Sequence, residues 1–594
     1  MARRGVALIL TLFASVLLMA ASAFVTFYFL VGREPAIPRS ATLAIRLGSD
    51  LAEVPPDDVF GYIGGARTPT VRGIVDNLRK ASVDDRIRAV MVKTDGFTTP
   101  YWGKIQEVRN AILDFKESGK PVYVYLEFAG DRDYYLASAA DQVFLMPSSS
   151  VDLTGIATYA LFLRGTLDKI GAYADLRHIG AYKTAVNQFT ETGFTEAHRE
   201  MSESLNRDLF DEIVRGIAVG RNKSEDEVRA IIDGGPLLAA DAFEAGLVDH
   251  LAYQDQVEEI LRNGNEESEL ADTSEVSGED YERVSLASLG LNRGPRIALL
   301  YVAGTIVNGR SGYDPVSGSV VGSDTLIEYI GRATRDDSIR AVVLRIDSPG
   351  GSATASDAVW HELQAAKEDE HERPIVASMS DLAASGGYYI AMGADAIVAQ
   401  PSTLTGSIGI FGGKLVTGGV YEKLGANIGT TSVGAYAEMN SPVRPYNEAE
   451  GQKLEEYLQA FYDNFIEKAA ASRQTTPGQI DRVAQGRVWT GRQALENGLV
   501  DQLGGLDAAI ALAKERAGIS PEREVQLVVY PPRRNLYEVL SDQLARSGAE
   551  TAISRWLAAN FSAPEIEGMR ALRGPFGLFR RGEALALMPF TFVR

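Results

Sequence analysis

Short apolar runs alternate with amphipathic stretches along most of the chain. The runs at 89–92 (Ala-Val-Met-Val) and 341–344 (Ala-Val-Val-Leu) have the length and composition of buried strands. Residues 355–367 instead place apolar side chains every three or four positions, which is the spacing of a helix with one buried face. Strands that alternate with helices in this way predict an α/β fold built from parallel βαβ units.

This pattern occurs in two copies along the chain. Residues 84–90 (DDRIRAV) return as residues 336–342 (DDSIRAV), and residues 131–183 align without a gap with residues 385–437. A repeat of this length outranks any domain count based on chain length alone. The sequence therefore predicts a tandem duplication of one large α/β unit.

The duplication sets the expected domain boundaries. We place the first repeat at 40–262 and the second at 295–530. Residues 263–294 crowd Glu and Asp among Ser, Thr and Gly, which predicts a solvated acidic linker. Residues 531–594 have no counterpart in the first repeat and form a tail of unassigned role, for which docking onto the protein is favoured over contact with a membrane or partner.

A long uncharged segment lies near the N-terminus. Residues 5–32 are 28 positions without a charge, longer than the roughly 20 needed to cross a bilayer. Residues 1–39 are therefore predicted to be a membrane anchor with one transmembrane helix before the repeats. Small residues at 21–23 resemble a cleavage site but lie inside the apolar run, which favours an uncleaved anchor. The short preceding tail favours export of the rest of the chain.

Composition excludes several classes of function. The net charge of -20 and the pI near 4.9 give no electrostatic reason to bind nucleic acid. A chain without cysteine has no disulfides, thiolate metal sites or cysteine nucleophile. The five histidines lack the spacing of a metal-binding helix, so we predict neither a metal nor a cofactor.

The two copies differ where chemistry would lie. Ser385, within Ala-Ser-Gly-Gly, aligns with Asp131, and Lys183 aligns with Ala437. An isolated Ser-Gly-Gly is most often a tight turn, and an isolated lysine is most often solvated. Because each copy holds one candidate that the other lacks, we expect the repeats to share one site, with a serine nucleophile and a lysine base.

Other residues near the serine would complete such a site. The backbone N–H groups of Gly351, at the end of a Ser-Pro-Gly-Gly loop, and of Gly386 are candidates for an oxyanion hole. Ser407 is a candidate to orient the lysine by a hydrogen bond, although the sequence equally fits a serine that only forms a turn. No histidine occurs from residue 372 onward, so a triad with histidine after Ser385 is unavailable within the second repeat. Lysine can replace histidine only where dry surroundings lower its pKa.

Four motifs lie at 181–183 (AYK), 348–351 (SPGG), 383–389 (AASGGYY) and 401–409 (PSTLTGSIG). Together they resemble peptidase family S49, the signal peptide peptidase A family, in its long duplicated form. The likeness covers about residues 40–530. It implies a Clp/crotonase-like superhelical fold in each repeat, with Ser385 as nucleophile, Lys183 as general base and Ser407 as the residue that orients the lysine.

The resemblance also implies a biological setting. Such a protein is a serine endopeptidase anchored in the bacterial plasma membrane, with its catalytic part on the outer, periplasmic side. Its substrates are cleaved signal peptides and other unfolded apolar peptides, and it assembles as a homo-oligomer, a tetramer in the duplicated form. Two other readings stay open at this point: a non-catalytic membrane scaffold, and a crotonase-type acyl-CoA enzyme, which shares the fold but needs no serine beside its oxyanion hole.

Overall fold

The computed structural model describes most of both repeats. The described residues are 35–48, 50–54, 69–263, 274–314, 318–368, 373–532 and 582–589, with a few single positions elsewhere. The uncharged run 5–32 of the predicted anchor lies outside them apart from four positions. Within this described part of the chain, no helix is both long and apolar enough to cross a bilayer.

Six parallel strands form the sheet of the first repeat, in the order β10-β5-β3-β2-β1-β11. Their bounds are β1 Ala41–Leu47, β2 Ile87–Thr94, β3 Val122–Leu126, β5 Gln142–Leu145, β10 His250–Leu251 and β11 Ser274–Ser277. Helices α3 (Val71–Val83) and α4 (Gly103–Lys116) connect β1 to β2 and β2 to β3. Strands β1, β2 and β3 bury nearly every position, which explains their continuous apolar runs.

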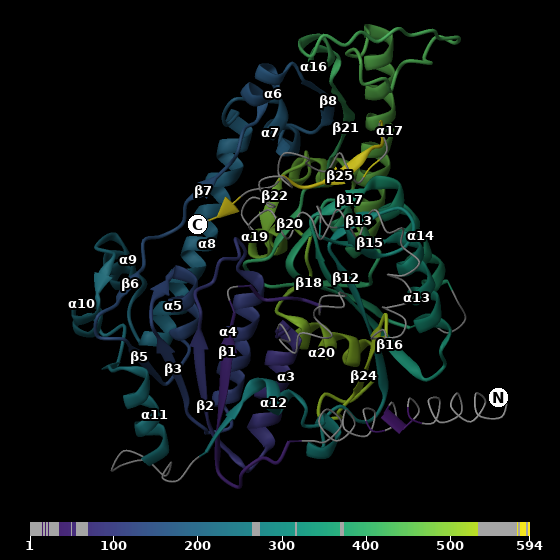
Figure 1. The fold of residues 1–594 in the computed structure, drawn as a ribbon. Helices are drawn as coiled ribbons and strands as arrows, with labels where there is room; N and C mark the ends of the chain where they lie inside the picture. The colour runs from purple at the N-terminus through teal and green to yellow at the C-terminus, as the bar shows by residue number, and fades with distance from the viewer. Residues whose placement is uncertain are drawn as a thin grey trace, which may run out of the picture.

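The second repeat builds the same arrangement. Its sheet contains β12 Arg296–Ala303, β16 Ile339–Ser348, β18 Ile375–Ala384, β19 Ala396–Ala399, β20 Leu404–Gly406, β22 Val488–Thr490, β23 Gln502–Leu503 and β24 Gln526–Tyr530. Strands β24, β12, β16, β18, β19 and β23 follow one another as β11, β1, β2, β3, β5 and β10 do in the first sheet. Figure 1 shows the two sheets side by side, the first repeat in purple and blue, the second in teal and green. The predicted α/β class and duplication are confirmed.

Part of the predicted linker is folded onto the first repeat. Residues 274–277 form β11, which pairs with β1, and α12 (Gly278–Glu282) follows it. Tyr281 is fully buried, and Lys80 Nζ donates a hydrogen bond of 2.6 Å to its carbonyl. The first repeat therefore continues past residue 262. Backbone hydrogen bonds make the edge pairing, so the polar composition that predicted a solvated segment does not oppose it.

A third sheet joins the two repeats. Its order is β14-β15-β13-β17-β25-β21-β8, with bounds β8 Tyr173–Ile179, β13 Thr305–Val307, β14 Gly312–Asp314, β15 Gly318–Gly322, β17 Gly350–Ser352, β21 Ile410–Val416 and β25 Leu585–Leu587. Strand β8 of the first repeat pairs antiparallel with β21 of the second over seven residue pairs. Strand β25 belongs to the C-terminal tail (yellow in Figure 1) and is docked, as the sequence favoured.

Paired charges are buried where the repeats meet. Arg345, on β16, is 0% exposed and contacts Glu53 and Glu107 of the first repeat, each at 2.7 Å. Removing one partner of a buried ion pair leaves an uncompensated charge, which costs several kcal/mol. The ion pairs of Arg345 with the two glutamates therefore stabilise the docking of one repeat onto the other.

Candidate active site

Ser385 lies at a strained turn between β18 and helix α15 (Gly386–Ala391). Its backbone has φ 56° and ψ -111°, a region that residues other than glycine rarely adopt. Two hydrogen bonds of 2.8 Å hold the turn: Ser385 N–H donates to the Gly406 carbonyl, and the Tyr389 N–H donates to the Ser385 carbonyl. The strand end and the helix start thus fix the position of the hydroxyl.

Lys183 reaches this serine from the first repeat. It follows strand β8 and precedes a short 3-10 helix, Thr184–Val186. Its Nζ lies 2.8 Å from Ser385 Oγ, 3.0 Å from Ser407 Oγ and 3.0 Å from the Ser407 carbonyl oxygen. The structure therefore brings together the serine and the lysine that the sequence singled out in different repeats, with Ser407 beside them.

The surroundings of Lys183 favour its neutral form. The lysine, Ser385 and Ser407 are all 0% exposed. Burial lowers the pKa of Lys183 well below its usual value, because the ammonium loses its hydration. In the neutral amine, two N–H groups can donate to the two Ser407 oxygens, which leaves the lone pair directed at the Ser385 hydroxyl. This arrangement can accept a proton from the serine.

Two glycine-rich loops meet beside the serine. Gly350 and Gly351 both lie on β17, and the Gly350 N–H is engaged by Ser348 Oγ, to which it donates at 3.2 Å. A Cβ placed on Gly386 would lie 3.1 Å from the Gly351 nitrogen and only 2.6 Å from Ser356 Oγ. A side chain at Gly386 would therefore clash, and its absence allows the two predicted oxyanion donors to come together.

The equivalent turn in the first repeat is structural. Asp131, which aligns with Ser385, accepts hydrogen bonds of 3.1 Å from the N–H groups of Thr154 and Gly155. Ala437, which aligns with Lys183, is exposed. The divergence seen in the sequence therefore leaves Ser385 in one repeat and Lys183 in the other, in contact across the interface.

A second lysine of the first repeat was missed by sequence reasoning. Lys104 Nζ contacts Asp347 at 2.7 Å and Asp381 at 3.3 Å, and its backbone N–H donates to Asp381 Oδ1 at 2.8 Å. Asp347 lies on β16 shortly before Gly351, and Asp381 lies on β18 shortly before Ser385. Lys104 thus braces the two strand ends that carry the glycine loop and the serine.

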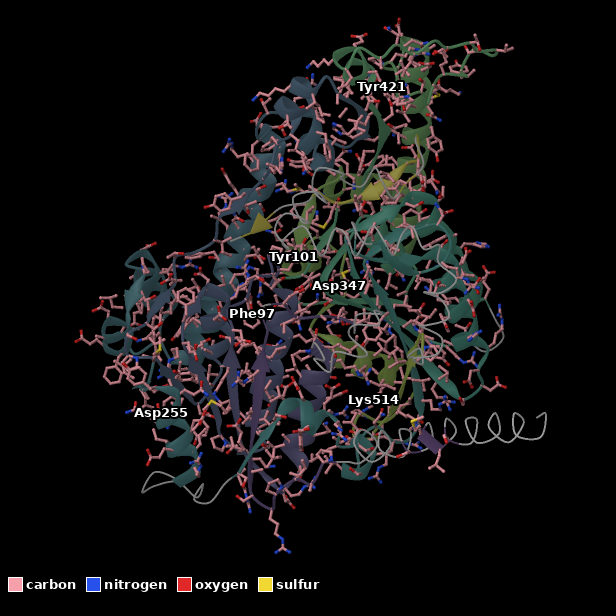
Figure 2. The ribbon with its side chains drawn as sticks, in the orientation of Figure 1. Phe97, Tyr101, Asp255, Asp347, Tyr421 and Lys514 are labelled. Atoms are coloured by element: carbon pink, nitrogen blue, oxygen red, sulfur yellow. The ribbon has the colours of Figure 1, made fainter. Side chains whose placement is uncertain are left out.

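The environment of Lys104 differs from that of Lys183. Burial alone would lower the pKa of Lys104, but the two aspartates outweigh it and raise that pKa above the usual value, so the ammonium stays charged. Figure 2 labels Tyr101 and Asp347 of this region near the centre of the molecule. One sequence signal existed: Lys104 lies in the first turn of α4, where the helix dipole disfavours a cation without acidic partners.

The sequence matches the model of one protein family in both repeats. The family model described as Peptidase family S49 matches residues 114–267 and 367–520, once in each repeat and over more than half of the chain. The chain belongs to peptidase family S49. The repeated match agrees with the duplicated sheets of this S49 peptidase.

Curated relatives extend the same result. The S49 peptidase is 37% identical over 78% of its length to the chloroplastic serine protease SPPA of Arabidopsis thaliana, covering 68% of that protein. It is 34% identical to Protease 4 of Salmonella typhi and 29% identical to Protease 4 of Haemophilus influenzae, in each case over 84% of its length and covering 80% and 82% of those proteins. The S49 peptidase is thus a serine endopeptidase, and the scaffold and acyl-CoA readings are not retained.

Proposed function

We propose that Ser385 is the nucleophile of the S49 peptidase and that Lys183 is its general base. The observation that carries this proposal is the 2.8 Å contact between Lys183 Nζ and Ser385 Oγ, two side chains that are fully buried. A serine hydroxyl becomes a nucleophile when an adjacent base takes its proton. Because burial lowers the pKa of Lys183, the neutral amine that can accept this proton is present at a lower pH than for an ordinary lysine.

The proposed reaction has two steps. Ser385 Oγ attacks the peptide carbonyl carbon while its proton passes to Lys183 Nζ, and the N–H groups of Gly351 and Gly386 stabilise the resulting oxyanion. The C–N bond then breaks, and the Lys183 ammonium returns its proton to the leaving amine. Water hydrolyses the acyl-enzyme by the same route, with Lys183 again taking the proton. Ser407 orients the amine throughout.

We extend the proposal to substrate and setting. The substrates are cleaved signal peptides and other unfolded apolar peptides, since the surface of a folded protein could not reach a buried dyad. A relative from Enterococcus faecium, whose name includes signal peptide peptidase, is 38% identical over 30% of the chain and supports this class. The uncharged segment 5–32 anchors the protein in the bacterial plasma membrane as a single-pass helix, with the catalytic part on the periplasmic side. The repeats adopt the Clp/crotonase-like fold, and the protein assembles as a homotetramer.

A labelling experiment tests the dyad. Full-length protein in detergent is treated with a serine-directed phosphonate, and the modified residue is identified by mass spectrometry. We expect the adduct on Ser385 and a loss of peptidase activity of about 10³-fold or more in Ser385→Ala and in Lys183→Met. The double variant should be no worse than either single one, because the two residues act as a unit.

The matched control is Lys169→Met, which changes an exposed lysine of the same repeat and should leave activity unchanged. An adduct on another serine, or activity of Lys183→Met within tenfold of the wild type, would contradict the proposed dyad.

A further inference from the structure

A three-residue segment of the second repeat contacts the loop that carries the lysine. Residues 485–487 (Gln-Gly-Arg), the bridging segment, directly precede β22. The Tyr182 N–H donates a hydrogen bond of 2.8 Å to the Gln485 carbonyl. A Cβ on Gly486 would lie 2.5 Å from the Lys183 nitrogen and 2.6 Å from its Cα, so only glycine allows this approach. The bridging segment therefore packs directly on the backbone of the proposed base.

The same segment holds the turn that carries Ser407. The Ser407 N–H donates to the Arg487 carbonyl, and the Gly486 N–H donates to the Ile408 carbonyl, each at 2.7 Å. Ser407 has a φ of 48°, a left-handed conformation that is uncommon for serine and is held here by these two hydrogen bonds. The proposed base and the serine beside it are thus both attached to one short stretch of backbone.

The side chain of Arg487 adds a second connection. Its guanidinium carbon lies 4.7 Å from the centre of the Tyr182 ring and 4.4 Å from the centre of the Trp489 ring. A guanidinium that stacks on aromatic rings is held by cation–π attraction as well as by packing. The carboxylate of Glu200, from the first repeat, accepts hydrogen bonds of 2.7 Å from Arg487 Nη1 and from the Tyr182 hydroxyl. Arg487 therefore restrains the tyrosine that immediately precedes Lys183.

The duplication marks Arg487 as it marks the serine and the lysine. Residues 494–501 (ALENGLVD) repeat residues 242–249 (AFEAGLVD), and on this register Arg487 aligns with Gly235. The first repeat has no guanidinium at this place, and its equivalents of the serine and the lysine are Asp131 and Ala437. A residue that serves the site and not the shared fold is expected to show this pattern.

We propose that the bridging segment, and Arg487 in particular, positions Lys183 for proton transfer from Ser385; this inference rests on the proposed dyad. The backbone of the segment sets the separation between the loop of Lys183 and the turn of Ser407, whose two oxygens contact the amine. Arg487 stiffens this connection by stacking on Tyr182. Its guanidinium lies over the tyrosine, so Arg487 acts through the lysine loop and is a positioning residue.

A matched pair of glycine substitutions tests the backbone part of the proposal. Gly486 has a φ of 77° and Gly498 a φ of 73°, so alanine suffers similar backbone strain at either place. The new methyl group meets the Lys183 backbone at Gly486, whereas none of the described residues has an atom within 4 Å of a Cβ on Gly498.

The assay follows hydrolysis of a quenched fluorescent peptide by full-length protein in detergent. We expect kcat to fall about 100-fold in Gly486→Ala with little change in KM, because a shift of about 1 Å in a catalytic group has an effect of this size. Phosphonate labelling of Ser385 should slow by the same factor. Gly498→Ala should keep wild-type kinetics.

Removal of the guanidinium tests Arg487 without changing the backbone, and it keeps the proposal testable if Gly486→Ala does not fold. Arg487→Met keeps an unbranched stem, loses the stacking on the two rings, and should lower kcat about tenfold at unchanged KM. The control is Arg373→Met, because Arg373 contacts Asp337 at 3.4 Å just before β18, at the opposite end of that strand from Ser385. It should keep wild-type kinetics, with the folding of each variant checked by thermal unfolding.

The outcomes separate this inference from the proposed function. Wild-type kcat in Arg487→Met would overturn the role of the arginine, and a raised KM at unchanged kcat would overturn it as well, because the arginine would then bind the peptide. Equal losses of kcat in Gly486→Ala and Gly498→Ala would show an effect of backbone strain and would overturn the role of the segment. Wild-type activity in Lys183→Met would instead overturn the proposed dyad.

Discussion

Substitution of Ser407 by alanine tests how the base is held. The Ser407 hydroxyl lies 3.0 Å from Lys183 Nζ, and the Ser407 carbonyl lies at the same distance. Ser407→Ala removes the first acceptor and keeps the second, so one buried N–H of the lysine loses its partner. A buried donor without a partner costs about 1–3 kcal/mol, which corresponds to a rate loss of roughly 5- to 160-fold.

The pH dependence separates this role from a purely structural one. The hydroxyl accepts from the ammonium more strongly than from the neutral amine, so its removal penalises the charged form more. The pKa of Lys183 should fall further, and the ascending limb of kcat against pH should move to lower pH. We expect kcat to fall by this factor of roughly 5 to 160, with little change in KM, since Ser407 contacts the base and not the peptide.

Steady-state kinetics on a quenched fluorescent peptide, measured across pH, provide the assay. Ser402→Ala is the matched control, because Ser402 is also buried but donates its hydroxyl to Gln106 at 2.7 Å, away from the lysine. It should retain wild-type kinetics, with both variants checked by thermal unfolding. Wild-type kcat in Ser407→Ala, or a limb that moves to higher pH, would refute the reasoning.

Three further predictions concern the base and the contact between the repeats. Wild-type activity should rise with pH as Lys183 loses its proton, over a pH range below the usual pKa of lysine. The free energy of unfolding should rise over the same pH range, because the lysine of the unfolded chain still binds a proton there. Lys183→Met should remove this pH dependence of the free energy of unfolding. Lys104→Met leaves the buried Asp381 and the partly buried Asp347 without their cation and should cost about 3–5 kcal/mol by urea unfolding. Lys116→Met, at a more exposed ion pair, should cost under about 1 kcal/mol, and equal losses would contradict the bracing role. Fragments 40–291 and 295–594 should each be inactive and should regain activity when mixed, and serine labelling of the second fragment at the full-length rate would show that the site is not shared.

The architecture could be predicted from the sequence because its signals are local. Continuous apolar runs such as 89–92 reflect strands buried on both faces, and helical spacing at 355–367 reflects one buried face. The repeat of these signals predicted two sheets of one order, which the structure has. The edge strand at 274–277 was not predicted: three of its four side chains are exposed, as its polar composition indicates, but its pairing uses backbone groups that composition does not report.

The chain by itself also identified Ser385 and Lys183, because the duplication supplied an internal comparison in which each residue is lost from the opposite copy. Tertiary structure decided what that comparison could not: the 2.8 Å contact between them, the burial that lowers the pKa of the lysine, and the bracing by Lys104. It also paired the tail strand at 585–587 with the glycine loop at 350–352. Distances between residues some 200 positions apart, and the loss of hydration around them, arise only when the two repeats dock.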